Sequence, residues 1–163
     1  MLKKFVSSLL VILLLVGCSS SNKEETVEPE NTEQEASVAD LAKEIVDKLG
    51  MAESLTEFPS NRMKGMLFQM DEEAITDGAL YIDSNKKADT IGVFTTNNPD
   101  KCLSYIQDYI QSLTDAANNY SPDELFKIDK AIVETNDARD MVVFIICEDV
   151  ETAKAEANRV LGK

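Results

Sequence analysis

Apolar and polar residues follow two different spacings along this 163-residue chain. Apolar residues recur every three or four positions over residues 38–49, 99–117 and 150–161, which is the spacing of amphipathic helices. Four shorter apolar runs have the length and composition of strands. They are 79–82, 91–94, 131–133 and 141–147. The last run is apolar at seven consecutive positions, which predicts a strand covered on both faces.

The ends of the predicted helices carry recognisable start and stop residues. Ser37 and Asp40 have the spacing of a capping box, and Gly50 follows the first helix as a stop. Pro99 suits the first position of the long helix, and Asp149 suits the cap of the last one. Two further short helices are predicted, over residues 60–69 and from residue 121.

The order of these elements predicts an α+β fold in a single domain, residues 37–163. Consecutive strands joined by short turns pair antiparallel, so we expect a mostly antiparallel four-stranded sheet packed against helices. Strand, turn, strand and helix follow one another over residues 79–113 and again over residues 131–161. This repetition is consistent with a duplicated ββα unit.

Residues 1–17 have the pattern of a signal peptide. Lys3 and Lys4 precede an apolar stretch, residues 5–16, that only two serines interrupt. The stretch is shorter than the ~20 apolar residues that a membrane-spanning helix needs. An ordinary signal peptide ends in an A-x-A-like site, but residues 15–18 of this chain are Leu-Val-Gly-Cys.

Residues 15–18 resemble the lipobox of bacterial lipoproteins. The resemblance implies cleavage before Cys18, a diacylglyceryl group on the Cys18 thiol, and a lipid anchor on the extracytoplasmic side of the cell membrane. Two acyl chains give stable anchoring where one chain is marginal. The alternative interpretation is an uncleaved N-terminal helix in which Cys18 has no special role.

The charge of the chain is strongly acidic. Residues 18–36 contain six glutamates, one lysine and no aromatic residue, so we expect a disordered, self-repelling tether there. Loss of residues 1–17 removes two lysines and no acidic residue, which changes the net charge from −14 to −16. Such a charge argues against binding to nucleic acid or to anionic lipid headgroups.

Two cysteines remain if Cys18 is lipidated. Cys102 and Cys147 lie in apolar surroundings on a predicted helix and strand, so we expect two buried free thiols. A disulfide is the alternative, because an exported protein meets an oxidising environment. The chain has no histidine, which removes the commonest general base and a common zinc and copper ligand. We therefore predict no metal site and no cofactor.

Three segments resemble one family of bacterial proteins. They are residues 87–94 (KADTIGVF), 120–133 (YSPDELFKIDKAIV) and 141–157 (MVVFIICEDVETAKAEA). The chain is similar over roughly residues 49–162 to the domain-of-unknown-function 4358 family, small lipoproteins of clostridia-like Gram-positive bacteria. It departs from that pattern at residues 136–140, Asn-Asp-Ala-Arg-Asp, where glycine is usual. The resemblance implies an exported, lipid-anchored protein and no particular activity.

A methionine-rich segment is the candidate binding face. Met63, Met66 and Met70 share one side of the predicted second helix, and Phe68 lies between them in the sequence. Burial of this side in the core is the preferred interpretation, and a groove for a peptide or partner is the second. The third, Cu(I) binding, rests on the affinity of thioethers for that ion.

The sequence favours a binding module over an enzyme. Acidic residues cluster at 71–77 and 148–151, but neither cluster has the spacing of a calcium loop, so we interpret both as solvated surface. We assign no catalytic residue, and we expect the domain to engage an envelope protein, peptide or glycan. The alternative is an accessory cell-envelope hydrolase that uses carboxylates such as Asp83, Asp89 or Glu124.

Overall fold

The computed structural model describes residues 36–63 and 74–163. The predicted signal peptide and nearly all of the predicted tether, with Cys18, lie outside the described residues. So do three of the four residues of the candidate binding face, Met66, Phe68 and Met70. The interpretations of these residues stay predictions.

The strands of the described chain form one antiparallel sheet of five strands, in the order β1-β2-β3-β5-β4. The strands are β1 (Leu55–Glu57), β2 (Asp77–Asp83), β3 (Thr90–Thr95), β4 (Ile132–Asn136) and β5 (Met141–Ile146). The α-helices are α1 (Val38–Lys48), α2 (Ser60–Arg62), α3 (Pro99–Tyr120), α4 (Leu125–Ile128) and α5 (Val150–Leu161). Two 3₁₀ turns complete the order, η2 (Pro122–Glu124) and η3 (Asp137–Arg139).

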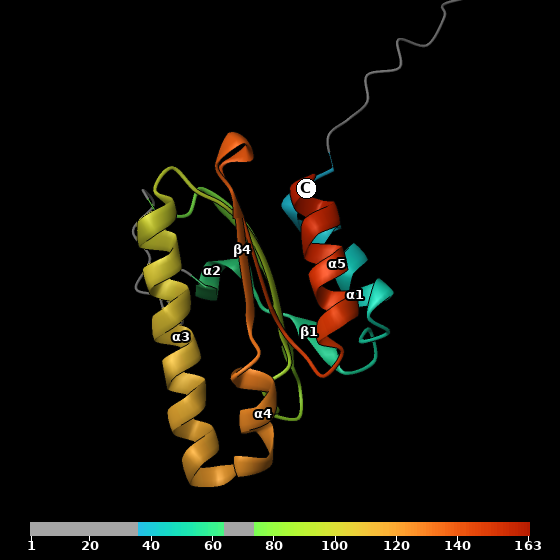
Figure 1. Cartoon of the computed structure of the whole chain (residues 1–163), viewed down its shortest axis with the longest axis vertical. Helices are drawn as coiled ribbons and strands as arrows, with labels where there is room; N and C mark the ends of the chain where they lie inside the picture. The colour runs from blue at the N-terminus through green and yellow to red at the C-terminus, as the bar shows by residue number, and fades with distance from the viewer. Residues whose placement is uncertain (1–35, 64–73) are drawn as a thin grey trace, which may run out of the picture. The chain divides into compact units, whose positions relative to one another are not determined.

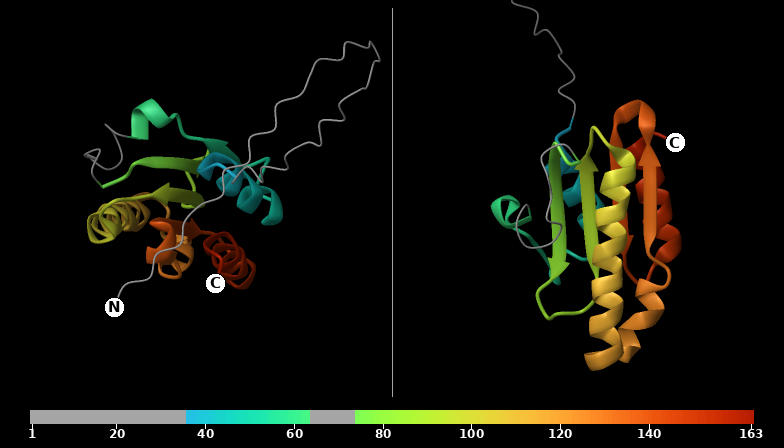
Figure 2. Two further views of the ribbon diagram at one scale, coloured as in Figure 1. Left: turned by 90° about the horizontal axis from the view of Figure 1, so that it is seen from above. Right: turned by 90° about the vertical axis from the view of Figure 1, so that its left-hand side faces the viewer.

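Helices cover both faces of the sheet. Helices α1 and α5 pack on one face, while α3 and α4 pack on the other (Figures 1 and 2). Each face has its own apolar cluster, because side chains alternate between the two sides of a strand. Along β5, Val143 and Ile145 join the cluster under α1 and α5, while Val142, Phe144 and Ile146 join the one under α3.

The prediction of a strand buried on both faces is confirmed in β5, where all six residues are buried. It pairs with β3 on one side and β4 on the other. The α+β class and the antiparallel sheet are confirmed as well.

The predicted count of four strands was one too few. The fifth strand, β1, pairs with β2 and is only three residues long, with Leu55 as its single buried side chain. So short a segment shows no alternation that a sequence pattern could reveal. The duplicated ββα unit is not confirmed: strand-strand-helix does occur twice, but α3 and α5 lie on opposite faces of the sheet.

The predicted caps at Ser37 and Asp149 are confirmed, whereas the side chain of Ser121 makes no cap hydrogen bond. The side chain of Ser37 accepts a hydrogen bond from the backbone N–H of Asp40 at 3.1 Å, and the reciprocal bond of the capping box is present. Asn98 caps α3, with Pro99 in its first turn, and Asp149 caps α5 by accepting from the backbone of Thr152.

Asp140 lies in the turn between β4 and β5, and residues 136–140 contain no glycine. Its φ of +49° lies in the left-handed region, which glycine adopts more readily than any other residue. Aspartate tolerates this region better than most residues do, so the turn between β4 and β5 forms without glycine.

The ring of Phe94 lies against two glycines of the central strands. Phe94 on β3 is fully buried and is the cross-strand partner of Gly78 on β2. A Cβ atom on Gly78 would lie 2.5 Å from the Phe94 ring, and one on Gly92 would lie 2.7 Å from it. The absence of side chains at these two positions therefore makes room for one of the largest fully buried side chains of this core.

We predict that Gly92→Ala lowers the free energy of unfolding by about 1–3 kcal/mol, because the added methyl group overpacks the core. The same substitution should cost less in a Phe94→Leu background, where the ring is gone. Urea denaturation of the single and double variants measures both values. Equal stability of Gly92→Ala and the unmodified protein would contradict this account of the packing.

Candidate functional site

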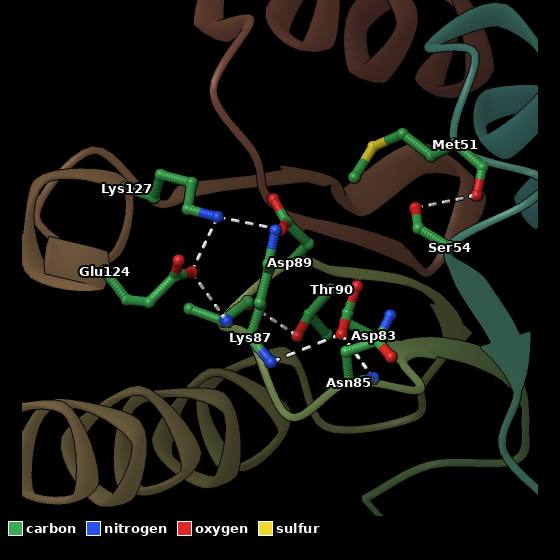
Figure 3. Close-up of polar contacts among 10 residues, drawn as sticks. Met51, Ser54, Asp83, Asn85, Lys87, Asp89, Thr90, Glu124 and Lys127 are labelled. Carbon is green, nitrogen blue, oxygen red and sulfur yellow. Dashed lines mark hydrogen bonds and ion pairs between the residues drawn. The ribbon is translucent and has the colours of Figure 1, made fainter. Parts of the chain in front are cut away.

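The candidate site lies at one end of the sheet, where the turn between β2 and β3 meets α4 and the start of α5 (Figure 1). Asp83, at the end of β2, holds this turn together. Its carboxylate is buried and accepts hydrogen bonds from the backbone N–H groups of Asn85 at 2.6 Å and Lys87 at 3.3 Å (Figure 3). Lys86 adopts a left-handed φ of +63° in the turn.

Lys127, Asp89 and Glu124 form a buried ion cluster, here called the Lys127 cluster. The Lys127 ammonium lies 2.8 Å from a carboxylate oxygen of Asp89 and 2.6 Å from one of Glu124. The same Glu124 oxygen accepts the backbone N–H of Ala88 at 3.0 Å (Figure 3). The cluster thus joins α4 and η2 to a turn that lies 36 to 38 residues earlier in the sequence.

The ion pairs favour the charged forms of Lys127 and Glu124. Burial is the largest single effect on the pKa of Lys127 and lowers it, but the two carboxylates together raise it above the ordinary value. Burial acts in the opposite direction on Glu124, where the bonds from Lys127 and Ala88 outweigh it and hold the pKa below the ordinary value. At neutral pH the Lys127 ammonium and the Glu124 carboxylate are therefore both charged.

This arrangement suits a structural role better than acid–base chemistry. A general acid of the hydrolase type needs a carboxyl group whose pKa is raised toward neutrality. The pKa of Glu124 shifts the other way, and the Lys127 ammonium is bound by both carboxylates. The structure brings Asp89 and Glu124 together as a pair, while Asp83 serves the turn.

Sequence reasoning missed Lys127. Lys127 is only 6% exposed, which is rare for a lysine. The available signal was its position three residues after Glu124 in a helical segment, a spacing that brings two side chains together. Nothing in the sequence indicated that Asp89 would join them.

Two hollows lie on either side of the Lys127 cluster. The larger one, here called the α3 groove, has a volume of about 430 Å³ and lies between the end of α3, η2, α4 and the turn. It is lined by Lys86, Lys87, Ala88, Leu113, Ala116, Ala117, Tyr120, Ser121, Glu124 and Ile128. A smaller hollow of about 250 Å³ borders Asp89, Lys127 and the start of α5, and Lys87 lines both.

The α3 groove is mainly apolar. Two small residues of α3, Ala116 and Ala117, line the groove and leave space in it. Leu113 and Ile128 add larger apolar side chains to its lining. Tyr120 stands at its edge with 86% of its surface exposed, the highest value among the large apolar residues of the described chain. A concave apolar surface with a few polar groups is the usual form of a small-molecule site.

The two cysteines are buried and free, as predicted. Cys102 belongs to the apolar cluster under α3 and Cys147 to the cluster under α1 and α5, so the sheet separates them. Burial raises the pKa of the Cys102 thiol to about 12 and that of Cys147 to about 11. Neither is a thiolate at neutral pH, so neither is suited to act as a nucleophile.

The candidate binding face is described at one residue only. Met63 is 5% exposed and packs in the apolar cluster under α3, which is the core interpretation for that side chain. Of the acidic cluster at 148–151, Asp149 is occupied as the cap of α5. Within residues 36–63 and 74–163, no three side chains of the metal-binding types are grouped to hold an ion.

Comparisons with known proteins assign no family: no family model, no curated protein and no solved structure matches this chain. Among the helices of the described residues, none is both long and apolar enough to span a bilayer.

We predict that Lys127→Met lowers the free energy of unfolding by about 3–5 kcal/mol, because two buried carboxylates lose their shared cation. Lys130→Met, at an exposed position three residues later, is the matched control and should change stability by less than about 0.5 kcal/mol. Chemical denaturation of both variants measures the difference. Similar stabilities of the two variants would contradict the proposed strength of the Lys127 cluster.

We predict that Glu124→Gln lowers the free energy of unfolding at neutral pH by about 1–3 kcal/mol, since a charged hydrogen-bond acceptor is lost. The native pKa of Glu124 lies below the ordinary value of 4.5, so its charge stabilises the fold fully above that pH. This contribution is lost as the pH falls through the lower native pKa. The stability difference between the two proteins should therefore shrink with acidification below pH 4.5.

Urea denaturation over a series of pH values measures this difference. Glu151→Gln, at an exposed position of α5, is the control and should show no such trend. A difference for Glu124→Gln that stays constant from neutral to acidic pH would show that the Glu124 charge does not stabilise the fold.

Proposed function

We propose that this protein is an extracytoplasmic lipoprotein of the cell membrane whose α+β domain binds a ligand without catalysing a reaction. The observation that carries the binding part is the α3 groove, a concave apolar surface beside a charged cluster whose ions already bind one another. The Leu-Val-Gly-Cys motif at residues 15–18, which follows a basic and then an apolar segment, supports the location.

The position of the groove in the domain is compatible with a tethered binding module. The start of α1 lies at one end of the folded domain, and the end of α3 with α4 lies at the other (Figures 1 and 2). A lipid anchor joined through residues 18–36 would therefore leave the groove accessible to molecules outside the membrane. Envelope proteins, peptides and glycans are the classes of partner expected there.

The resemblance to the domain-of-unknown-function 4358 family supports the same location. Its family pattern includes the Tyr-x-Pro-x-Glu turn, residues 120–124. In this protein, those residues border the α3 groove through Tyr120, Ser121 and Glu124. The part of the sequence that carries the resemblance is therefore also part of the candidate site.

An accessory hydrolase has less support. Such an enzyme needs one carboxyl group to donate a proton while another activates water or attacks the substrate. Here Asp89 and Glu124 bind the same ammonium, and the pKa of Glu124 is lowered. The charge of Glu124 stabilises the fold at neutral pH, so this residue is not suited to donate a proton.

We predict that Cys18→Ala abolishes acylation and leaves unprocessed precursor in cells, because the modification and the cleavage both depend on the thiol. Mass spectrometry of the protein from native membranes should show a chain that begins at an acylated residue 18. Cys102→Ala, which changes a buried cysteine of the folded domain, is the control and should be processed normally. A mature N-terminus at any other position would overturn the lipoprotein proposal.

A further inference from the structure

We propose that the α3 groove binds a small amphipathic anion, with an apolar body against α3 and an acidic head group at Lys86 and Lys87. This inference rests on the proposed role of the domain as a binding module and names the class of its ligand. The groove volume of about 430 Å³ lies in the range of small-molecule sites.

The apolar part of the groove has room for an aliphatic or aromatic body. Ala116 and Ala117 follow Leu113 on α3 at helical spacing, and Tyr120 continues the same side. Alanines in the middle of this row leave a depression between the larger residues at its ends. The exposed ring of Tyr120 gives a ligand a further apolar surface to cover.

The charge at the rim of the groove selects an anion. Lys86 and Lys87 are exposed, and neither ammonium pairs with a carboxylate within the described residues. Two adjacent unpaired cations beside an apolar depression are complementary to a molecule with one acidic end.

The nearby carboxylates have closer partners than the two lysines, although the charge of Lys87 also lowers the pKa of Glu124. Glu124, the acidic residue of the lining, is bound by Lys127 and by the backbone N–H of Ala88. Asp83 is buried beneath the turn and accepts hydrogen bonds from the turn's own backbone (Figure 3). The rim therefore presents the two ammonium groups to an incoming ligand.

The test uses the processed chain, residues 18–163, with Cys18→Ser so that no acyl chain competes for the groove. Octanoate is the probe, and octanamide has the same apolar body without the charge. Backbone amide NMR shifts locate the bound probe and give its Kd. We expect octanoate to shift residues 86–88 and 113–120, and octanamide to bind at least about threefold more weakly, as loss of one exposed ion pair predicts.

Lys86→Gly removes one ammonium group of the rim without straining the turn, because glycine suits the left-handed φ of +63° at this position. The melting temperature of this variant should be unchanged or higher. Lys86→Gly should weaken octanoate about two- to fivefold and leave octanamide unaffected. Lys130→Ala, an exposed lysine outside the groove, should change neither. Ala116→Phe should fill the groove and weaken both probes.

Octyl phosphate tests whether the head group of the ligand is a phosphate or a carboxylate. Tighter binding of octyl phosphate than of octanoate indicates a phosphate, and weaker binding indicates a carboxylate. Shifts outside the α3 groove, equal affinity for octanoate and octanamide, or unchanged octanoate binding in Lys86→Gly would each overturn the inference. No binding of any probe would overturn it too. The lipid anchor at Cys18 is tested separately by mass spectrometry, so failure of this inference and failure of the proposed location are distinguishable.

Discussion

Strand β5 sets the main constraint on this fold, because its six buried residues need apolar cover on both faces of the sheet. Pairing with β3 and β4 places β5 inside the sheet, and two separate helical layers then bury the alternate side chains. The α1 and α5 layer covers one face and the α3 layer covers the other. The position of α3, and therefore of the groove at its end, follows from the need to cover the second face.

The Lys127 cluster adds an electrostatic constraint at the end of the sheet. Burying a lysine and two carboxylates costs free energy that only their close pairing offsets, so the turn before β3 and the segment before β4 must stay together. Every buried polar side-chain atom of the described residues has a hydrogen-bond partner, which agrees with this tight arrangement. The same contacts join the turn with Lys86 and Lys87, which is one wall of the α3 groove, to η2 and α4.

The ion pairs of the Lys127 cluster therefore support the surface of the candidate site and do not supply it with reactive groups. The cluster carboxylates are held by Lys127, and both thiols are buried and protonated at neutral pH. What remains accessible is an apolar depression, an exposed tyrosine and two lysines. Such groups suit binding by apolar burial and charge, which is the combination that the proposed tethered binding module requires.

The sequence by itself determined the features that depend on neighbouring residues. The caps at Ser37 and Asp149 and the buried strand β5 follow from spacing, because caps and strand burial are encoded within a few positions. The tertiary structure alone decided which faces α3 and α5 cover, the pairing of β1, and the meeting of Asp89 with Lys127 across 38 residues. Such contacts depend on how the whole chain buries its apolar surface, and no local pattern specifies them.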